Sequence, residues 1–333
     1  MTERSLQTPL KSGFNAKSTA RQIVGQRDLR GKNIIVTGGY SGIGREITRA
    51  LAGAGASVLV PARDLAKARK NLRGIPGVAI DALDLLEPAS IDLFADRFLA
   101  GQKPLHILIN CAGIMAPPLT RDRRGYESQF AINHLGHFQL TARLWPALRQ
   151  ADGARVVAVS SRAQRMGGVN FADINYEQTA YQPMQAYAQS KTANVLFAVR
   201  LDALARKYGV RAFAAHPGLV PGTDLGRQAA NPLVRFLYLL MLWKKDLFLR
   251  RRPHHSGDEL KNIRQGAATP VWCALSEELN GKGGVYCEDC NIASAVTDRA
   301  SPYGVLPWAI DAELAAKLWT ISEKMTGVKF LTN

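Results

Sequence analysis

Short apolar runs rich in β-branched residues recur along most of the chain, and each run predicts a buried strand. These runs lie at residues 33–37, 57–60, 78–80, 105–109, 155–159 and 210–215. The segments between them carry apolar residues at helical spacing, over residues 43–54, 65–72, 88–99, 126–148 and 185–208. Strands that are apolar throughout and alternate with helices indicate a parallel sheet covered on both faces. We therefore expect an α/β fold, a doubly wound parallel sheet that binds ligands at the carboxyl ends of its strands.

Two parts of the chain lack this alternation. Residues 1–30 are polar and basic without clear periodicity, and they predict a loosely packed N-terminal extension. Residues 31–333 are expected to form a single domain in which the pattern stops at residue 221. A late strand at residues 285–287 is expected to complete the sheet, and the segment at about 224–265 is expected to be an insertion into the domain.

Composition narrows the class of protein. The chain has 333 residues, of which 47% are hydrophobic and 21% charged, which excludes a disordered chain, a coiled coil and a disulfide-stapled mini-protein. The net charge of +16 leaves two interpretations open: affinity for an anionic partner, or a solvated surface that happens to be basic. We favour the second and expect no nucleic-acid binding, because no nucleic-acid motif is present.

Cysteine usage and the N-terminus bear on location. Cys287 and Cys290 have C-x-x-C spacing, but neither a second such pair nor a histidine pair lies nearby, so we expect no metal site. The first residues are polar and do not resemble a secretory signal. The apolar stretch at residues 232–243 contains Arg235 and is too short to span a bilayer. We expect a cytoplasmic protein.

A glycine-rich turn follows the first strand and opens the first long helix. Glycines allow a backbone to approach a pyrophosphate, and a helix N-terminus offers N–H groups and a partial positive charge. A purely structural turn is the alternative interpretation. The residues of the turn that we expect to contact a dinucleotide are Gly38, Tyr40, Ser41, Gly42, Ile43 and Gly44.

Acid–base chemistry is suggested by the helix at residues 185–208. Tyr187 and Lys191 are four positions apart and therefore share one face. A free phenol has a pKa of about 10, and a nearby ammonium group lowers it toward neutrality. Ser161, at the end of the fifth strand, can hydrogen-bond a substrate oxygen.

These motifs together resemble the short-chain dehydrogenase/reductase family over roughly residues 30–223. The glycine turn, the Asn-Cys-Ala-Gly segment at residues 110–113 and the Tyr-x-x-x-Lys motif occur in the family's order. The resemblance implies a Rossmann-type fold and a catalytic set of Asn133, Ser161, Tyr187 and Lys191. Asn133 is implied to hold a water that links Lys191 to solvent, and the second serine of the pair 160–161 is implied to be catalytic. The further cofactor contacts that it implies, besides Tyr187 and Lys191, are Asp84, Leu85, Asn110, Ala112, Gly113, Pro217, Gly218, Val220 and Thr223.

The end of the second strand bears on the choice of cofactor. Enzymes that use NAD usually carry an acidic residue there, which binds the ribose 2′-hydroxyl. Here Arg63 stands after the strand and is suited to a 2′-phosphate. Alternatively, Arg63 is a solvated side chain and Asp64 only caps the next helix. We expect NADP(H), with NAD(H) as the alternative.

Within the family, three segments are similar to the branch of retinol dehydrogenases and WW-domain-containing oxidoreductases, although no WW domain is present. They are the segments at residues 133–138, 191–197 and 283–290. The branch implies a lipophilic alcohol or carbonyl substrate and a homo-oligomer. It also implies that the segment at about 224–265 covers the substrate cleft as a lid. The apolar residues at helical spacing in that segment would face the substrate, weakly contact a membrane surface, or simply pack on the core; they are Leu233, Phe236, Leu237, Leu240 and Trp243.

The sequence thus predicts an NADP(H)-dependent alcohol dehydrogenase/carbonyl reductase with Tyr187 as general acid and base. The alternative is a non-catalytic protein that binds NADP(H) and acts as a regulator or scaffold.

Overall fold

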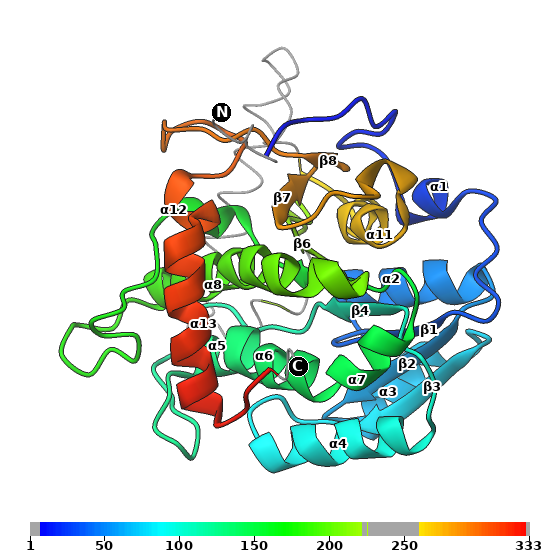
Figure 1. Cartoon of the computed structure of the whole chain (residues 1–333), viewed down its shortest axis with the longest axis horizontal. Coiled ribbons are helices and arrows are strands. Elements are labelled where there is room, and N and C mark those ends of the chain that lie inside the picture. Colours follow the sequence, from blue (N-terminus) through cyan, green and yellow to red (C-terminus); the bar gives the residue numbers. More distant parts are fainter. Residues whose placement is uncertain (1–6, 222–224, 226–259, 331–333) are drawn as a thin grey trace.

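The protein is built around an eight-stranded sheet with helices on both faces (Figure 1). The computed structural model describes residues 7–221, 225 and 260–330. The strand order is β3-β2-β1-β4-β5-β6-β7-β8, and all neighbouring pairs are parallel except β7 and β8. The strands are β1 Asn33–Val36, β2 Ser57–Ala62, β3 Val78–Ala82, β4 Ile107–Asn110, β5 Arg155–Val159, β6 Arg211–Ala215, β7 Val285–Glu288 and β8 Asn291–Ile292. The predicted doubly wound parallel sheet is confirmed.

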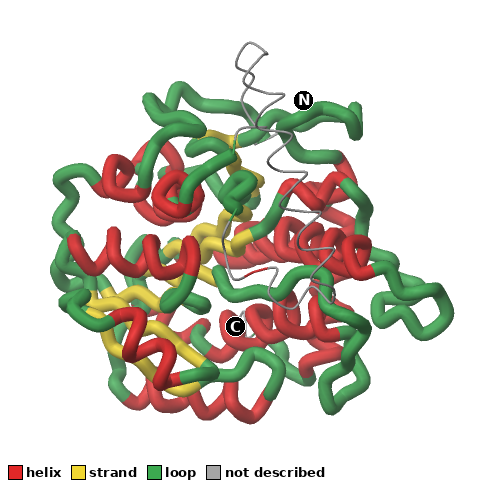
Figure 2. Tube along the Cα trace, turned by 180° about the vertical axis from the view of Figure 1, so that it is seen from behind, coloured by secondary structure: helices red, strands yellow, loops and turns green. Residues whose placement is uncertain are grey.

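The described residues form helices between the strands, where the helical spacing predicted them, and further helices before β1, before β7 and after β8, which it did not predict. The helices are α1 Ala20–Val24, α2 Gly42–Gly53, α3 Leu65–Leu72, α4 Pro88–Ala100, α5 Ser128–Phe130, α6 Gly136–Arg143, α7 Trp145–Gln150, α8 Pro183–Ala205, α10 Ile263–Gly266, α11 Ala268–Leu275, α12 Pro307–Ile310 and α13 Ala312–Thr326. Figure 2 shows the strands running between helices on either side.

Side chains of successive strand residues enter two separate cores. Ile35 and Leu108 pack with Phe138 of α6, under a cover that also includes α4, α7, α8 and α13. Ile34 and Ile109 pack on the other face, against α1, α2 and α11. Because alternate strand residues point to opposite faces, strands that are buried on both sides must be apolar throughout.

The helix expected at residues 126–148 is interrupted. A π-helical turn, Ala131–Leu135, separates α5 from α6, and α6 ends before Leu144. Pro146 lies in the first turn of α7, where a proline costs nothing because its missing N–H would have no partner. The π-helical turn has no comparable signature in the sequence.

The N-terminal segment packs more tightly than a loose extension. Thr19 and Gln22 form a capping box on α1, and Ile23 and Val24 are buried in the core that contains α11. Nearer the N-terminus, the Gln7 side chain donates to the carbonyl groups of Tyr286 and Ala293 and accepts from the Tyr286 N–H. Residues 7–24 therefore belong to the domain.

Most of the segment predicted as a lid, with its five apolar residues at helical spacing, lies outside the described residues, and so does Thr223, predicted as a cofactor contact. Leu219 and Leu260, on either side of these residues, form a parallel bridge. Among the described helices, none is long and apolar enough to cross a bilayer.

Candidate active site

Most of the residues selected from the sequence lie at one edge of the sheet. The glycine turn follows β1, Arg63 follows β2, Asp84 and Leu85 follow β3, and Asn110 ends β4. Ser161 lies just beyond β5, and Pro217, Gly218 and Val220 lie beyond β6. Because the strand order reverses between β1 and β4, a crevice for ligands is expected where these two strands end.

The glycine turn contacts the loop after β4 at the point where the strand order reverses. Gly38 has a φ of +64°, and a Cβ there would lie 2.9 Å from the Cα of Ala112. A Cβ on Gly44 would collide with the carbonyl oxygen of Gly38. Only glycine fits at both positions, so the turn is compact and the first N–H groups of α2 lie beside it. Ser41 precedes α2 with extended backbone, and its side chain makes no capping hydrogen bond.

Asn133 connects the loop after β4 to α8. Its Oδ1 accepts from the Ile114 N–H at 2.9 Å, and its Nδ2 donates to the Ile114 carbonyl at 3.0 Å and to Ser190 Oγ at 2.9 Å. Asn133 lies in the π-helical turn, a feature that is frequent at functional sites. A Cβ on Gly113 would lie 3.0 Å from Asn133 Oδ1 and 3.5 Å from Lys191 Nζ. Gly113 thus lies where Asn133 and Lys191 come together.

Tyr187 and Lys191 are both buried on α8. The Lys191 ammonium lies 5.7 Å from the centre of the Tyr187 ring and donates to the Val159 carbonyl at the end of β5. Burial lowers the pKa of Lys191 to about 8. The nearby Cys111 thiol has its pKa raised to about 11 by burial, so it stays neutral and supplies no countercharge at neutral pH.

The two serines after β5 face different surroundings. Ser160 is buried, and its Oγ donates to the Lys191 carbonyl at 2.7 Å, which ties α8 to the sheet. Ser161 is half-buried, and its Oγ accepts from the Ala163 N–H at 3.1 Å. The alternation of strand residues therefore leaves Ser161 as the more accessible of the two hydroxyl groups.

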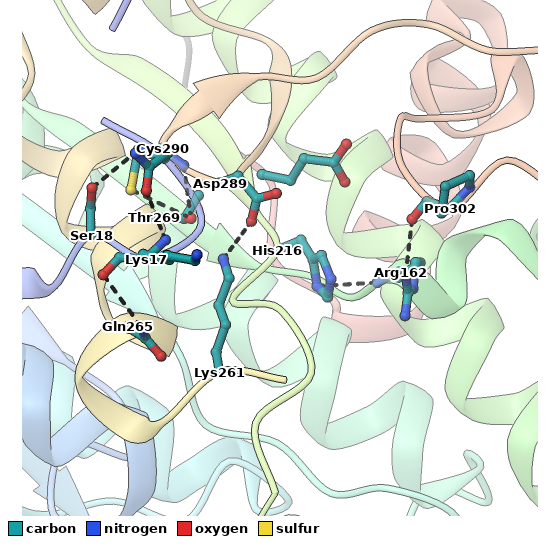
Figure 3. A network of polar contacts seen from close by, with 12 residues as sticks. Lys17, Ser18, Arg162, His216, Lys261, Gln265, Thr269, Asp289, Cys290 and Pro302 are labelled. Carbon is teal, nitrogen blue, oxygen red and sulfur yellow. Dashed lines mark hydrogen bonds and ion pairs between the residues drawn. The ribbon is translucent and has the colours of Figure 1, made fainter. Parts of the chain in front are cut away.

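The segment after β6 is held by partners that the sequence does not reveal (Figure 3). His216 Nδ1 accepts from the Arg162 N–H at 3.2 Å, and Lys261 forms a 2.5 Å ion pair with Asp289. Methylene groups of Lys261 lie so close to Gly218 that a Cβ there would be 2.6 Å from Lys261 Cδ. These contacts join the Ser161 loop and the turn between β7 and β8 to the segment Pro217–Gly218.

Three of the four cysteines are buried in the core. Cys273, Cys287 and Cys290 are buried free thiols, and burial raises the pKa of Cys287 and of Cys290. The described residues contain no group of three or more histidine, cysteine or acidic side chains that could hold a metal ion.

The geometry fits a dinucleotide. The glycine cradle and the α2 N-terminus offer a place for a pyrophosphate at the expected crevice. Asp64 caps α3 by accepting from the Lys67 N–H, so its carboxylate is engaged, whereas Arg63 beside it is exposed. Asp84 accepts from the Leu86 N–H, and the Leu85 carbonyl packs against Gly136.

A family model, related sequences and a solved structure all match this chain over most of its length. A model of the short chain dehydrogenase family matches residues 32–232. Retinol dehydrogenase 12 from Mus musculus is 37% identical over 309 residues, which span 91% of this chain and 88% of that protein. WW domain-containing oxidoreductase from Pongo abelii is 34% identical over 325 residues, 94% of this chain and 72% of that protein. A crystal structure of an uncharacterised protein from Mycobacterium paratuberculosis has a TM-score of 0.71 and 31% identity, and covers 94% of this chain and 99% of that chain.

Proposed function

Because this chain belongs to the short-chain dehydrogenase family, we propose that it is an NADP(H)-dependent enzyme that interconverts a lipophilic alcohol and its aldehyde or ketone. The resemblance read from its motifs is thereby confirmed. The observation that carries the proposed chemistry is the buried pair on α8, in which the Lys191 ammonium lies 5.7 Å from the centre of the Tyr187 ring.

Tyr187 acts as the general acid and base. In reduction, its phenolic oxygen gives a proton to the substrate oxygen, and in oxidation it takes one back. The Lys191 ammonium stabilises the phenolate that forms, and its burial strengthens that interaction. The bound dinucleotide supplies or accepts the hydride.

Ser161 and Asn133 assist this proton transfer. The Ser161 oxygen accepts from the Ala163 N–H, so its single proton is available for a substrate oxygen. Asn133 fixes the loop after β4 against α8, and its proposed role, taken from the family resemblance, is to hold a water that links Lys191 to solvent.

The preference for NADP(H) rests on the end of β2. Arg63 is exposed where a 2′-phosphate would arrive, and the carboxylate of Asp64 is occupied in capping α3. A lipophilic substrate is supported by the likeness to retinol dehydrogenase 12. A homo-oligomer and a cytoplasmic location stay predictions.

The proposal is tested with purified wild-type protein. Binding of NADPH and of NADH is titrated first, and oxidation of NADPH is then followed with lipophilic aldehydes, ketones and quinones, beginning with retinal. Tighter binding of NADPH and turnover of at least one carbonyl compound are expected. Tight binding without turnover in either direction would instead favour the non-catalytic alternative.

A further inference from the structure

A buried histidine, His137, lies one helical turn after Asn133. His137 lies in α6 with 3% of its surface exposed. Its Nδ1 lies 3.1 Å from the carbonyl oxygen of Asn133, and its Nε2 lies 2.9 Å from Thr37 Oγ1, at the start of the glycine turn. The imidazole therefore bridges two parts of the site that are separated by about a hundred residues along the chain.

The partners determine which nitrogen carries the proton. A carbonyl oxygen can only accept, so Nδ1 must donate to Asn133. Nε2 is then the acceptor, and the Thr37 hydroxyl donates to it. The Thr37 oxygen accepts in turn from the N–H groups of Cys111 at 2.8 Å and Ala112 at 3.0 Å. Both ring nitrogens of His137 are thus paired, and the Ile109 carbonyl, 3.4 Å from Thr37 Oγ1, is a second and more distant acceptor for the hydroxyl proton.

The ring is also kept uncharged beside a cation. Burial, against the opposing hydrogen bond to the Asn133 carbonyl and together with the Lys191 ammonium, lowers the pKa of His137 to about 4. The imidazole is therefore neutral at physiological pH, as the Nδ1-protonated tautomer requires. A charged side chain at this position would repel Lys191.

We propose that His137 is a positioning residue that holds the glycine turn and Asn133 in fixed relation through its two ring nitrogens. This proposal rests on the proposed function, since the glycine turn binds the dinucleotide there and Asn133 serves Lys191. The His137–Thr37 contact fixes the start of the turn against α6, and the N–H groups of Cys111 and Ala112 hold the same hydroxyl to the loop after β4. The other contact holds the backbone carbonyl of Asn133 in the π-helical turn. It thereby also positions the Asn133 side chain, which binds Ile114 and Ser190.

Two variants separate these contacts. In His137→Asn the carboxamide nitrogen can take the place of Nδ1, so the Asn133 contact is kept and the Thr37 contact is lost. In His137→Gln the carboxamide reaches the place of Nε2, so the Thr37 contact is kept and the Asn133 contact is lost. We expect His137→Asn to raise the Kd of NADPH roughly tenfold, with the pH profile of kcat/KM unchanged. We expect His137→Gln to lower kcat about tenfold and shift that pH profile, with the Kd of NADPH unchanged.

His134 supplies a matched control. It is also buried, one turn before His137, but its Nε2 pairs with Ser322 Oγ of α13, and its ring also hydrogen-bonds the Asn194 side chain of α8. His134→Gln is expected to change the melting temperature only. The proposal is overturned if both His137 variants behave like His134→Gln, or if both lose the same property.

A second pair of variants covers the case in which His137 variants fold poorly. Thr37→Ser keeps the hydroxyl, whereas Thr37→Val removes it. We expect Thr37→Val to raise the Kd of NADPH and Thr37→Ser to leave it near the wild-type value; equal values for the two would contradict the proposal. Failure of the proposed function would appear in the wild-type protein itself, as absent dinucleotide binding or absent turnover. Failure of the His137 proposal would appear only in comparisons among variants.

Discussion

Lys191 lies one helical turn beyond Tyr187 on α8, and its ammonium approaches the tyrosine ring to 5.7 Å inside the protein. The ammonium is held there by the Val159 carbonyl, so the charge cannot swing away from the phenol. This arrangement supplies the positive charge that the proposed proton transfer requires.

Replacing Tyr187 by phenylalanine removes the proton donor and leaves the ring in place. We expect kcat/KM to fall by about 10³-fold, because loss of general acid–base catalysis typically costs 10²–10⁴-fold. The Kd of NADPH should stay within roughly threefold of the wild-type value. Tyr208→Phe, just beyond the end of α8, is the control and should retain activity. Near-normal turnover by Tyr187→Phe would rule out the assigned role.

Arg63 is predicted to select NADP(H) over NAD(H). We expect Arg63→Ser to raise the Kd of NADPH by about 10–100-fold, because a charge-assisted contact to phosphate is lost. The Kd of NADH should change little. Arg69→Ser, at an exposed position of α3, controls for the loss of net charge. An equal effect of Arg63→Ser on both dinucleotides would show that Arg63 does not contact the 2′-phosphate.

Glu288 is predicted to make stability depend on pH. Burial raises the pKa of its carboxyl from 4.5 to about 7, and its Oε1 accepts from the Gly304 N–H. The folded protein therefore retains a proton that the unfolded chain releases. This contribution to stability is complete below pH 4.5 and is lost as the pH rises through 7, at about 1.4 kcal/mol per pH unit.

Glu288→Gln keeps the acceptor oxygen and removes the titration. We expect the unfolding free energy of the wild type to decline more steeply than that of the variant between pH 5 and 7. Urea denaturation at several pH values measures both slopes, and identical slopes would contradict the assignment.

The N-terminal segment is predicted to be part of the stable domain. Ile23 has 1% of its surface exposed, so Ile23→Ala should reduce the unfolding free energy by about 2–5 kcal/mol. Arg21→Ala, on the exposed side of the same short helix, should cost less than about 0.5 kcal/mol. A similar small effect for both variants would mean that residues 7–24 detach without consequence for the fold.

The features that could be predicted from the sequence are those with local signatures. Apolar strands, the glycine turn and the spacing of Tyr187 and Lys191 are each contained in a few consecutive residues, and each was found where expected. The pairing of Thr37 with His137 had no such signature, because it depends on how distant segments meet. The π-helical turn around Asn133 and the docking of Gln7 on β7 were missed for the same reason, since neither follows a periodic pattern.

The contacts of Gln7 have a consequence for how the protein is made. Its carboxamide bonds Tyr286 and Ala293, and α1 packs on α11, so the first described elements need partners more than 240 residues further along the chain. A ribosome synthesises those partners long after residues 7–24 have emerged. The apolar side of α1 therefore has no packing partner in α11 while the first strands are being synthesised. The packing of residues 7–24 is consequently among the late steps of folding, since it follows the synthesis of α11 and β7.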